Sequence, residues 1–156
     1  MANPFAKSKL FHKIGNITNT PPLRLRPPNG VAVVTTKGRK SGKLRTRAMR
    51  GVRDGDRVYA TAILGPRADW LRNIGANAHV TVKLGSKTYR ATARTITDAA
   101  ELARAREVYR PVAGWYDYFD YLTYVWGVPT RGKLLRTHDE WFDKGTPVVF
   151  ELQDDA

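Results

Sequence analysis

The feature that most constrains the fold of this chain is a series of short strand-like stretches divided by turns. Each stretch is an apolar run or alternates apolar and polar residues, and together they cover 31–36, 45–52, 57–63, 80–84, 89–95 and 147–152. Hairpin signals such as Asp54-Gly55-Asp56 separate them. Closely spaced strands joined by hairpins favour a small antiparallel barrel. We therefore predict the α+β class, with an antiparallel β-barrel of about six strands and flanking helices.

Helical patterns flank and interrupt these strands. We expect helices at 5–17, 68–74, 99–109 and 115–126, the first of them basic and amphipathic. Asp98 and Glu101 are spaced as in a capping box at the start of the third helix. The proline-rich stretch 20–30 is predicted to be a connector, because proline is excluded from helix interiors. The chain then divides into 1–30, a basic helix with its connector, and 31–156, the barrel domain.

The positive charge of the chain is concentrated at one end of the sequence. Residues 1–53 contain thirteen lysines and arginines and no acidic residue, whereas residues 54–156 contain fourteen of each sign, so the net charge of +13 arises in the first third. A charge of this size predicts a polyanionic partner. The absence of cysteine excludes disulfides and thiolate chemistry. No apolar run reaches the roughly 18 residues of a membrane span and no secretory signal is evident, so we expect a cytoplasmic protein.

A basic, glycine-rich turn follows the first predicted strand directly. It reads Gly38-Arg39-Lys40-Ser41-Gly42 and leads to Arg45. Glycines allow backbone N–H groups to face an anion, and serine and arginine side chains can donate hydrogen bonds to it. We expect Arg47 and Arg50, further along the next strand, to lie on the same face as Arg45. The alternative interpretation is an ordinary solvated hairpin, and composition alone does not exclude it.

The sequence contains no standard catalytic set. His12, His79 and His138 are scattered without metal-ligand spacing, so we predict no metal site and expect them at the surface or at helix ends. The carboxylates of Asp117 and Asp120 are expected to face solvent. An anion site without an evident acid, base or nucleophile predicts chemistry performed by a bound cofactor.

The segment 115–126 is unusually rich in aromatic residues. Two interpretations are open. The aromatic side chains either pack into the core or form a lid against a planar ring or an apolar substrate.

Four elements taken together resemble the deazaflavin-dependent nitroreductase family. They are Gly38-Arg39-Lys40-Ser41-Gly42-x-x-Arg45, the hairpin Arg53-Asp54-Gly55-Asp56, Asp69-Trp70-x-x-Asn73-x-x-Ala76-Asn77, and Pro147-Val148-Val149. The similarity is good over residues 31–96 and weak in the C-terminal part. It implies a split β-barrel of the flavin-reductase type over 31–156 that binds the deazaflavin coenzyme F-420, whose tail carries a phosphate and glutamates. Flavin mononucleotide (FMN), with a single phosphate, is the alternative cofactor.

The resemblance also implies where the cofactor and the acceptor bind. The anionic tail would be held by Arg39, Lys40, Ser41, Gly42 and Arg45. The deazaflavin ring would lie along Ala62, Ile63, Leu64, Gly65 and Arg67, with Trp70 and Asn73 in support. The family transfers a hydride from the reduced ring to an activated acceptor such as a quinone, enone or nitroaromatic. We assign the acceptor side, including proton donation, to Tyr116, Tyr118 and Tyr121.

Two other classes of function remain open at this stage. The same barrel could carry a deazaflavin, a flavin or another apolar ligand without turnover. A basic nucleic-acid-binding barrel is disfavoured, because the aromatic residues lie apart from the basic third of the sequence. The expected partner is therefore a small-molecule acceptor rather than nucleic acid. Residues 5–17 suggest peripheral contact with an anionic membrane, and a homodimer is a further option that no residue decides.

Overall fold

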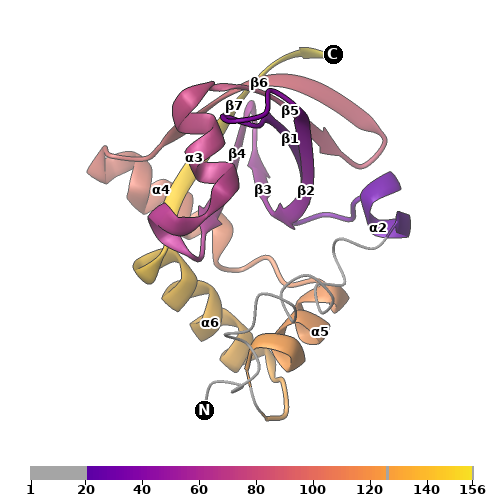
Figure 1. The fold of residues 1–156 in the computed structure, drawn as a ribbon. Helices are drawn as coiled ribbons and strands as arrows, with labels where there is room; N and C mark the ends of the chain where they lie inside the picture. Colours follow the sequence, from indigo (N-terminus) through magenta and orange to yellow (C-terminus); the bar gives the residue numbers. More distant parts are fainter. Residues whose placement is uncertain (1–20, 126, 156) are drawn as a thin grey trace.

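The computed structural model describes residues 21–125 and 127–155 and shows a curled antiparallel sheet with helices around it (Figure 1). Within these residues the sheet has seven strands, in the order β2-β1-β5-β6-β7-β4-β3. Their bounds are β1 Val31–Lys37, β2 Leu44–Arg50, β3 Val52–Asp54, β4 Arg57–Ala62, β5 His79–Leu84, β6 Lys87–Thr95 and β7 Thr146–Asp155. This curled sheet with flanking helices confirms the predicted α+β antiparallel barrel.

The seventh strand arises because Gly51 divides the predicted strand 45–52 into β2 and β3. A Cβ atom on Gly51 would lie only 2.8 Å from the Cβ of Ala32 and 3.2 Å from a methyl group of Val58, so these side chains leave no room for another here. The Gly51 N–H donates to the carbonyl of Gly30 at 2.9 Å, which extends the β1–β2 pairing by one residue. Glycine at position 51 thus permits this close packing.

The helices are α2 Pro21–Leu25, the 3₁₀ turn η3 Gly65–Arg67, α3 Asp69–Ala76, α4 Ala99–Tyr109, α5 Trp115–Tyr124 and α6 Arg131–Lys144. Helices α3, α4 and α5 form where the periodicity predicts them. The side chain of Asp98 accepts a hydrogen bond from the Glu101 N–H at 2.8 Å and caps α4. The helix expected at 5–17 lies outside the described residues.

Two helices differ from the sequence-based expectation. Helix α2 forms inside the stretch that we expected to be a connector, because its two prolines occupy the first helical positions, where no N–H is needed. Helix α6 was not predicted. The Thr130 hydroxyl caps α6 by accepting from the Lys133 N–H at 3.4 Å.

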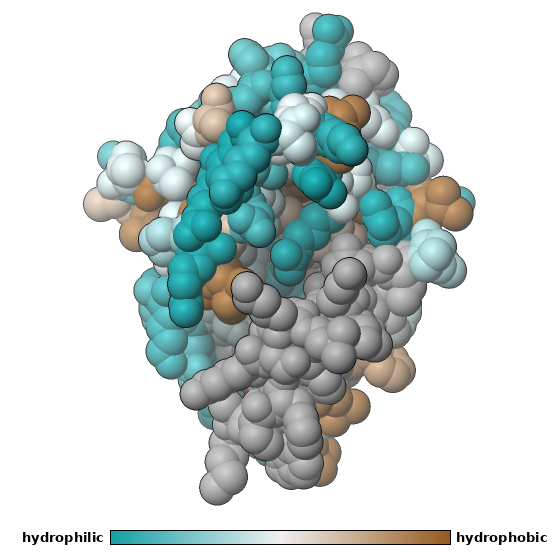
Figure 2. Space-filling model, viewed as in Figure 1, coloured by the Kyte–Doolittle hydropathy of each residue, from teal (hydrophilic) through white to brown (hydrophobic). Residues whose placement is uncertain are grey.

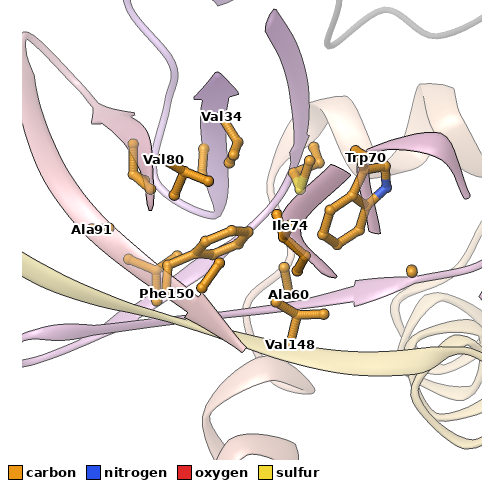
Figure 3. Close-up of a cluster of buried hydrophobic side chains, with 14 of the residues drawn as sticks. Val34, Ala60, Trp70, Ile74, Val80, Ala91, Val148 and Phe150 are labelled. Atoms are coloured by element: carbon orange, nitrogen blue, oxygen red, sulfur yellow. The ribbon is translucent and has the colours of Figure 1, made fainter. Parts of the chain in front are cut away.

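The main core lies inside the curl of the sheet, where α3 covers it (Figure 3). Val34, Ala60, Val80, Ala91, Val148 and Phe150 from the strands meet Trp70 and Ile74 from α3. The rings of Trp70 and Phe150 lie 6.3 Å apart. A second cluster, which includes Tyr59, Tyr109 and Phe142, joins β4 to α4 and α6.

The pairing register of β1 and β2 determines which residues share a face. Val34 pairs with Arg47 and Thr36 with Arg45, and these pairs lie on the same face as the main core. Val31 pairs with Arg50, on the opposite face of the sheet. That opposite face packs against Tyr116 of α5.

Candidate functional site

The turn between β1 and β2 is closed by its own backbone. The Gly38 N–H donates to the Lys43 carbonyl and the Gly42 N–H to the Gly38 carbonyl, both at 2.8 Å. Gly42 has a φ of 67°, a conformation that favours glycine. A Cβ on Gly38 would lie 3.0 Å from the Ser41 hydroxyl oxygen, so glycine also keeps the turn compact.

Arg39 is held in place by helix α3. Its backbone N–H and its Nη1 both donate to Oδ1 of Asn73, each at 3.2 Å. Its Nη2 lies 3.2 Å from Oδ1 of Asp69. The guanidinium is therefore fixed before any ligand binds.

Asn73 connects this arginine to the strand. The Asn73 side chain is buried, and its Nδ2 donates to the Thr36 hydroxyl at 3.1 Å. The Thr36 hydroxyl in turn donates to the Arg45 carbonyl at 3.5 Å. A single buried amide thus links α3, β1 and the basic turn.

These elements surround a cavity of about 470 Å³, which we call the cationic cavity. It is lined by Val34, Thr36, Gly38, Arg39, Lys40, Ser41, Arg45, Thr46, Arg47, Asp69, Trp70 and Asn73. Four lining residues are cations and one, Asp69, is an acid. Among the described residues, only Arg39 of the four cations forms an ion pair. Figure 2 shows hydrophilic side chains gathered over the face where α3 and the β1–β2 turn lie in Figure 1.

The lining chemistry fits a phosphate- or carboxylate-bearing group. Lys40, Arg45 and Arg47 can donate charge-assisted hydrogen bonds to an anion, and Ser41 adds a hydroxyl. Val34 and Trp70, which also belong to the main core, supply an apolar wall. Among the described residues no cluster of histidines and carboxylates has the arrangement of a metal site.

The predicted site residues divide into two groups in space. Arg39, Lys40, Ser41, Arg45, Trp70 and Asn73 all line the cationic cavity. Gly42 shapes the turn without lining the cavity. The loop residues expected along the ring do not line it either: Ala62 and Gly65 are buried, Arg67 is exposed, and Ile63 and Leu64 are partly exposed. The binding roles of all these residues stay predictions.

The three tyrosines lie on α5, outside the cationic cavity. Tyr116 is buried and its hydroxyl donates to the Asn29 carbonyl at 2.6 Å. Burial raises the pKa of Tyr116 well above its usual range. Tyr121 is buried and Tyr118 is half-buried. Their assignment to the acceptor side also stays a prediction.

Arg50 does not share a face with Arg45 and Arg47, contrary to our expectation. Arg50 is three positions beyond Arg47, and an odd spacing points a strand residue to the other face. The buried Arg50 Nη1 lies 3.0 and 3.1 Å from the two carboxylate oxygens of Asp117. Its Nη2 donates to the carbonyls of Tyr109, at 2.7 Å, and Val112.

The expectations for Asp117 and His138 were also wrong. Asp117 is buried by its pairing with Arg50, and it accepts the Gly114 N–H at 2.7 Å at the start of α5. His138 is buried on α6, with Nδ1 3.1 Å from the Arg110 carbonyl. Burial and the nearby Arg50 lower the pKa of His138 to about 4, so this histidine is neutral near pH 7.

Asp120 is half-buried rather than solvent-facing, and its Oδ1 is buried without a hydrogen-bond partner. Burial and the negative charge of Asp117 raise the pKa of Asp120 to about 7. His79, by contrast, is exposed as expected, whereas His12 lies outside the described residues.

Sequence reasoning missed one contact at the cavity, the ion pair between Asp69 and Arg39. The sequence did contain a sign of this contact, because Asp69 is the first residue of the Asp-Trp-x-x-Asn element. That element places Asp69 and Asn73 one helical turn apart on α3, on the face toward the basic turn. Nothing in the local sequence shows that this face meets residue 39.

Comparison with known proteins places the chain in a family. A profile of the F420H(2)-dependent quinone reductase family matches residues 15–127. Among solved structures, a domain-swapped dimer is 21% identical with a TM-score of 0.52, covering 80% of each chain. HutZ, the heme storage protein from Vibrio cholerae, is 13% identical with a TM-score of 0.51, covering 85% of this chain and 86% of that one.

These structural likenesses show the split-barrel fold alone. No helix among the described residues is long and apolar enough to cross a membrane. The profile covers well over half of the sequence. This chain therefore belongs to the F420H(2)-dependent quinone reductase family and is an oxidoreductase.

Proposed function

We propose that this enzyme transfers a hydride from the reduced deazaflavin F-420 to a quinone or a similarly activated acceptor, an enone or a nitroaromatic. The observation that carries the proposal is the convergence of four cations and one carboxylate on the cationic cavity. We further propose that Lys40, Arg45 and Arg47, together with the fixed Arg39, hold the cofactor's phosphate and glutamate tail. Each charge-assisted contact would contribute roughly 1.5–3 kcal/mol.

The number of cations favours the deazaflavin over FMN. A single phosphate can be satisfied by two or three donors, whereas a phosphate followed by several carboxylates extends along a row of them. Arg45 and Arg47 are two residues apart on β2 and lie on the same face, so they form such a row. Trp70 and Val34 would bound the less polar part of the same ligand.

The bound deazaflavin would supply the hydride, and the protein would supply position and a proton. Tyr118 and Tyr121 are the tyrosines that we assign to the acceptor side. Tyr116 would have to break its hydrogen bond to the Asn29 carbonyl before it could donate a proton elsewhere. We therefore propose that Tyr116 anchors α5 and that a neighbouring tyrosine or water delivers the proton.

The first test is a fluorescence titration with oxidised deazaflavin, with FMN and a short oligonucleotide in parallel. The variant Lys40→Glu/Arg45→Glu should bind the deazaflavin at least about 100-fold more weakly than the wild type, given the contact energies above. Arg26→Glu/Arg90→Glu is the matched control, because it changes the net charge equally at exposed cations outside the cavity. The control should stay within about threefold of the wild type.

Turnover then separates an enzyme from a carrier. Reduced deazaflavin bound to the protein should be reoxidised faster when a quinone or nitroaromatic is added. Binding without faster reoxidation would instead support a carrier. Binding of the oligonucleotide alone, steeply weakened by salt, would assign the charge to nucleic acid. If the cavity variant lost melting temperature in proportion to affinity, its cations would be structural.

The cellular location and the oligomeric state of the enzyme are less sharply defined than its chemistry. We propose a cytoplasmic enzyme that acts on small molecules. One of the solved structures of similar fold is a domain-swapped dimer, and a homodimer of this chain is an option that sedimentation velocity would decide.

A further inference from the structure

Exposed large apolar side chains are concentrated on one helix of the described structure. Trp115, Phe119 and Leu122 on α5 are 54%, 52% and 52% exposed, and Val128, shortly after the helix, is 73% exposed. The three helical residues are spaced i, i+4 and i+7, which places them on one face. We call these four residues the outer face of α5. In Figure 2, hydrophobic residues appear at the lower right, over the region that α5 occupies in Figure 1.

The opposite face of α5 anchors the helix to the protein. Tyr116, Asp117 and Tyr121 are buried there. Trp115 packs edge-on against both Tyr116 and Phe119, with ring centroids 6.1 and 5.9 Å away. The buried side of α5 therefore holds the helix in place, and its outer face presents a defined apolar surface.

Neither acid of α5 is fully exposed. Asp117, one of the two acids of α5, is turned inward and paired with Arg50. The other, Asp120, has a buried Oδ1 and a pKa raised to about 7 by burial and by Asp117. The sequence from Tyr121 to His138 contains no acidic residue at all.

Cations follow Val128 closely in the sequence, and one of them contacts it. Arg131, Lys133 and Arg136 lie in the first two turns of α6. The Lys133 Nζ donates to the carbonyl of Val128 at 3.1 Å, so this ammonium group is adjacent to the most exposed apolar residue of the set. Arg136 is exposed. An apolar face containing tryptophan, with lysine in contact and an exposed arginine one turn further along α6, matches the chemistry of an anionic lipid surface.

We propose that the outer face of α5 is a membrane-docking surface. Trp115, Phe119, Leu122 and Val128 enter the boundary between headgroups and acyl chains, and Lys133 and Arg136 bind anionic headgroups. The residues of this surface are not those of the stretch 5–17, for which the sequence suggested membrane contact. The proposal does not depend on the cofactor assigned to the cationic cavity, because none of these residues lines it.

Vesicle flotation with the full chain tests the proposal. Vesicles of phosphatidylcholine with 30% phosphatidylglycerol are compared with phosphatidylcholine alone. Trp115→Ser/Leu122→Ser should lower the partition coefficient for the anionic vesicles at least about tenfold, because two large apolar groups no longer leave water. Leu25→Ser/Leu44→Ser is the matched control, since these leucines are 70% and 74% exposed elsewhere, and it should stay within about twofold.

A charge variant tests the second half of the proposal. Lys133→Glu/Arg136→Glu should weaken binding to the anionic vesicles by more than about 25-fold, since each cation near such a surface contributes about fivefold and reversal adds repulsion. Binding to phosphatidylcholine alone should change little. Deazaflavin titration of both variants should match the wild type, which separates this proposal from that of the cationic cavity.

Three results would overturn the proposal. The first is wild-type binding by the α5 variant together with lost binding by Phe11→Ser/Ile14→Ser, which would assign lipid contact to residues 5–17. The second is absence of vesicle binding by the wild type. The third is a wild-type dimer in sedimentation velocity that becomes a monomer in Trp115→Ser/Leu122→Ser without any vesicle binding, which would make the outer face a contact between copies of this chain.

Discussion

Two ends of the same strand use arginine in opposite ways. At one end of β2, Arg45 and Arg47 face the cationic cavity and form no ion pair within the described structure. At the other end, Arg50 faces α5 and is enclosed by Asp117 and two backbone carbonyls. Arg47 and Arg50 are only three positions apart, yet Arg47 is available to a ligand whereas the charge of Arg50 is neutralised inside the protein.

The difference shows that the positive charge of the first third of the chain is not a single functional feature. A buried guanidinium requires partners for its charge and its donors, and the structure supplies them at Arg50. An exposed guanidinium is solvated by water and needs no protein partner, so Arg45 and Arg47 remain available to bind an anion. Substitution at the two ends of β2 should therefore affect different measurements.

The largest expected change in the free energy of unfolding is at Arg50, at the buried end of β2. Arg50→Met should lower the free energy of unfolding by about 3–5 kcal/mol, because Asp117 stays buried without its partner. Arg47→Met, on the cavity face, should change it by less than about 0.5 kcal/mol. Urea unfolding measures both. The double variant Arg50→Met/Asp117→Leu should recover part of the loss, and equal losses in the two single variants would refute the comparison.

The next effect depends on pH. The pKa of Asp120 is about 7 in the folded state and near 3.8 when unfolded, so the folded state binds this proton more tightly. Its contribution to stability is full below about pH 4 and is lost as the pH rises to about 7. Asp120→Asn should remove this dependence, so its unfolding free energy relative to wild type should rise by about 1–3 kcal/mol between pH 4.5 and pH 8.

His138 titrates in the same range with the opposite sign. Its pKa is lowered to about 4 from 6.5, so its contribution is lost as the pH falls between these values. Wild type and Asp120→Asn share this dependence, and their difference isolates Asp120. A pH-independent difference would show that Asp120 ionises as an ordinary surface carboxylate.

A smaller loss of stability is expected at Asn73, which links helix α3 to the basic turn. Asn73→Ala removes the acceptor that holds Arg39 and leaves the Thr36 hydroxyl without its donor. The unfolding free energy should fall by about 1–2 kcal/mol, and deazaflavin should bind roughly tenfold more weakly because Arg39 is no longer fixed. Asn77→Ala, at the end of the same helix, serves as the control and should leave the affinity unchanged in fluorescence titration.

The smallest expected change in stability is at the exposed ion pair. Asp69→Asn should alter the unfolding free energy by less than about 0.5 kcal/mol, because the Asp69 side chain is 81% exposed. Deazaflavin should bind about threefold more tightly, since one negative charge leaves the cavity. A weaker affinity in isothermal titration calorimetry would mean that Asp69 matters by orienting Arg39 rather than by opposing the ligand.

Local sequence predicted most of the fold. Alternation and hairpin turns gave the strands, and the Asp98 cap gave the start of α4, because these signals act over a few residues. The basic turn and the Asp-Trp-x-x-Asn element also predicted most of the lining of the cationic cavity, although the sequence alone did not show their contact.

The failures all involve contacts between distant residues. Asp117 and His138 carry no local sign of burial, because their partners lie on other elements of the fold: Arg50 is 67 positions from Asp117 in the sequence, and the Arg110 carbonyl is 28 from His138. The face of Arg50 was recoverable from strand parity and was misjudged. Helix α6 has a mixed polar pattern, and it is stabilised by burying Leu134, His138 and Phe142 against the rest of the protein.

The position of β7 has a consequence for how the chain is made. This strand comes last in the sequence, yet in the sheet it lies between β6 and β4. Among the described strands, the β3–β4 hairpin pairs with the rest of the sheet only through β7. During synthesis the hairpin therefore cannot pair with the rest of the sheet until residues 146–155 have left the ribosome. Until then a nascent chain of this enzyme exposes an open strand edge, and exposed edges of this kind favour aggregation and chaperone binding.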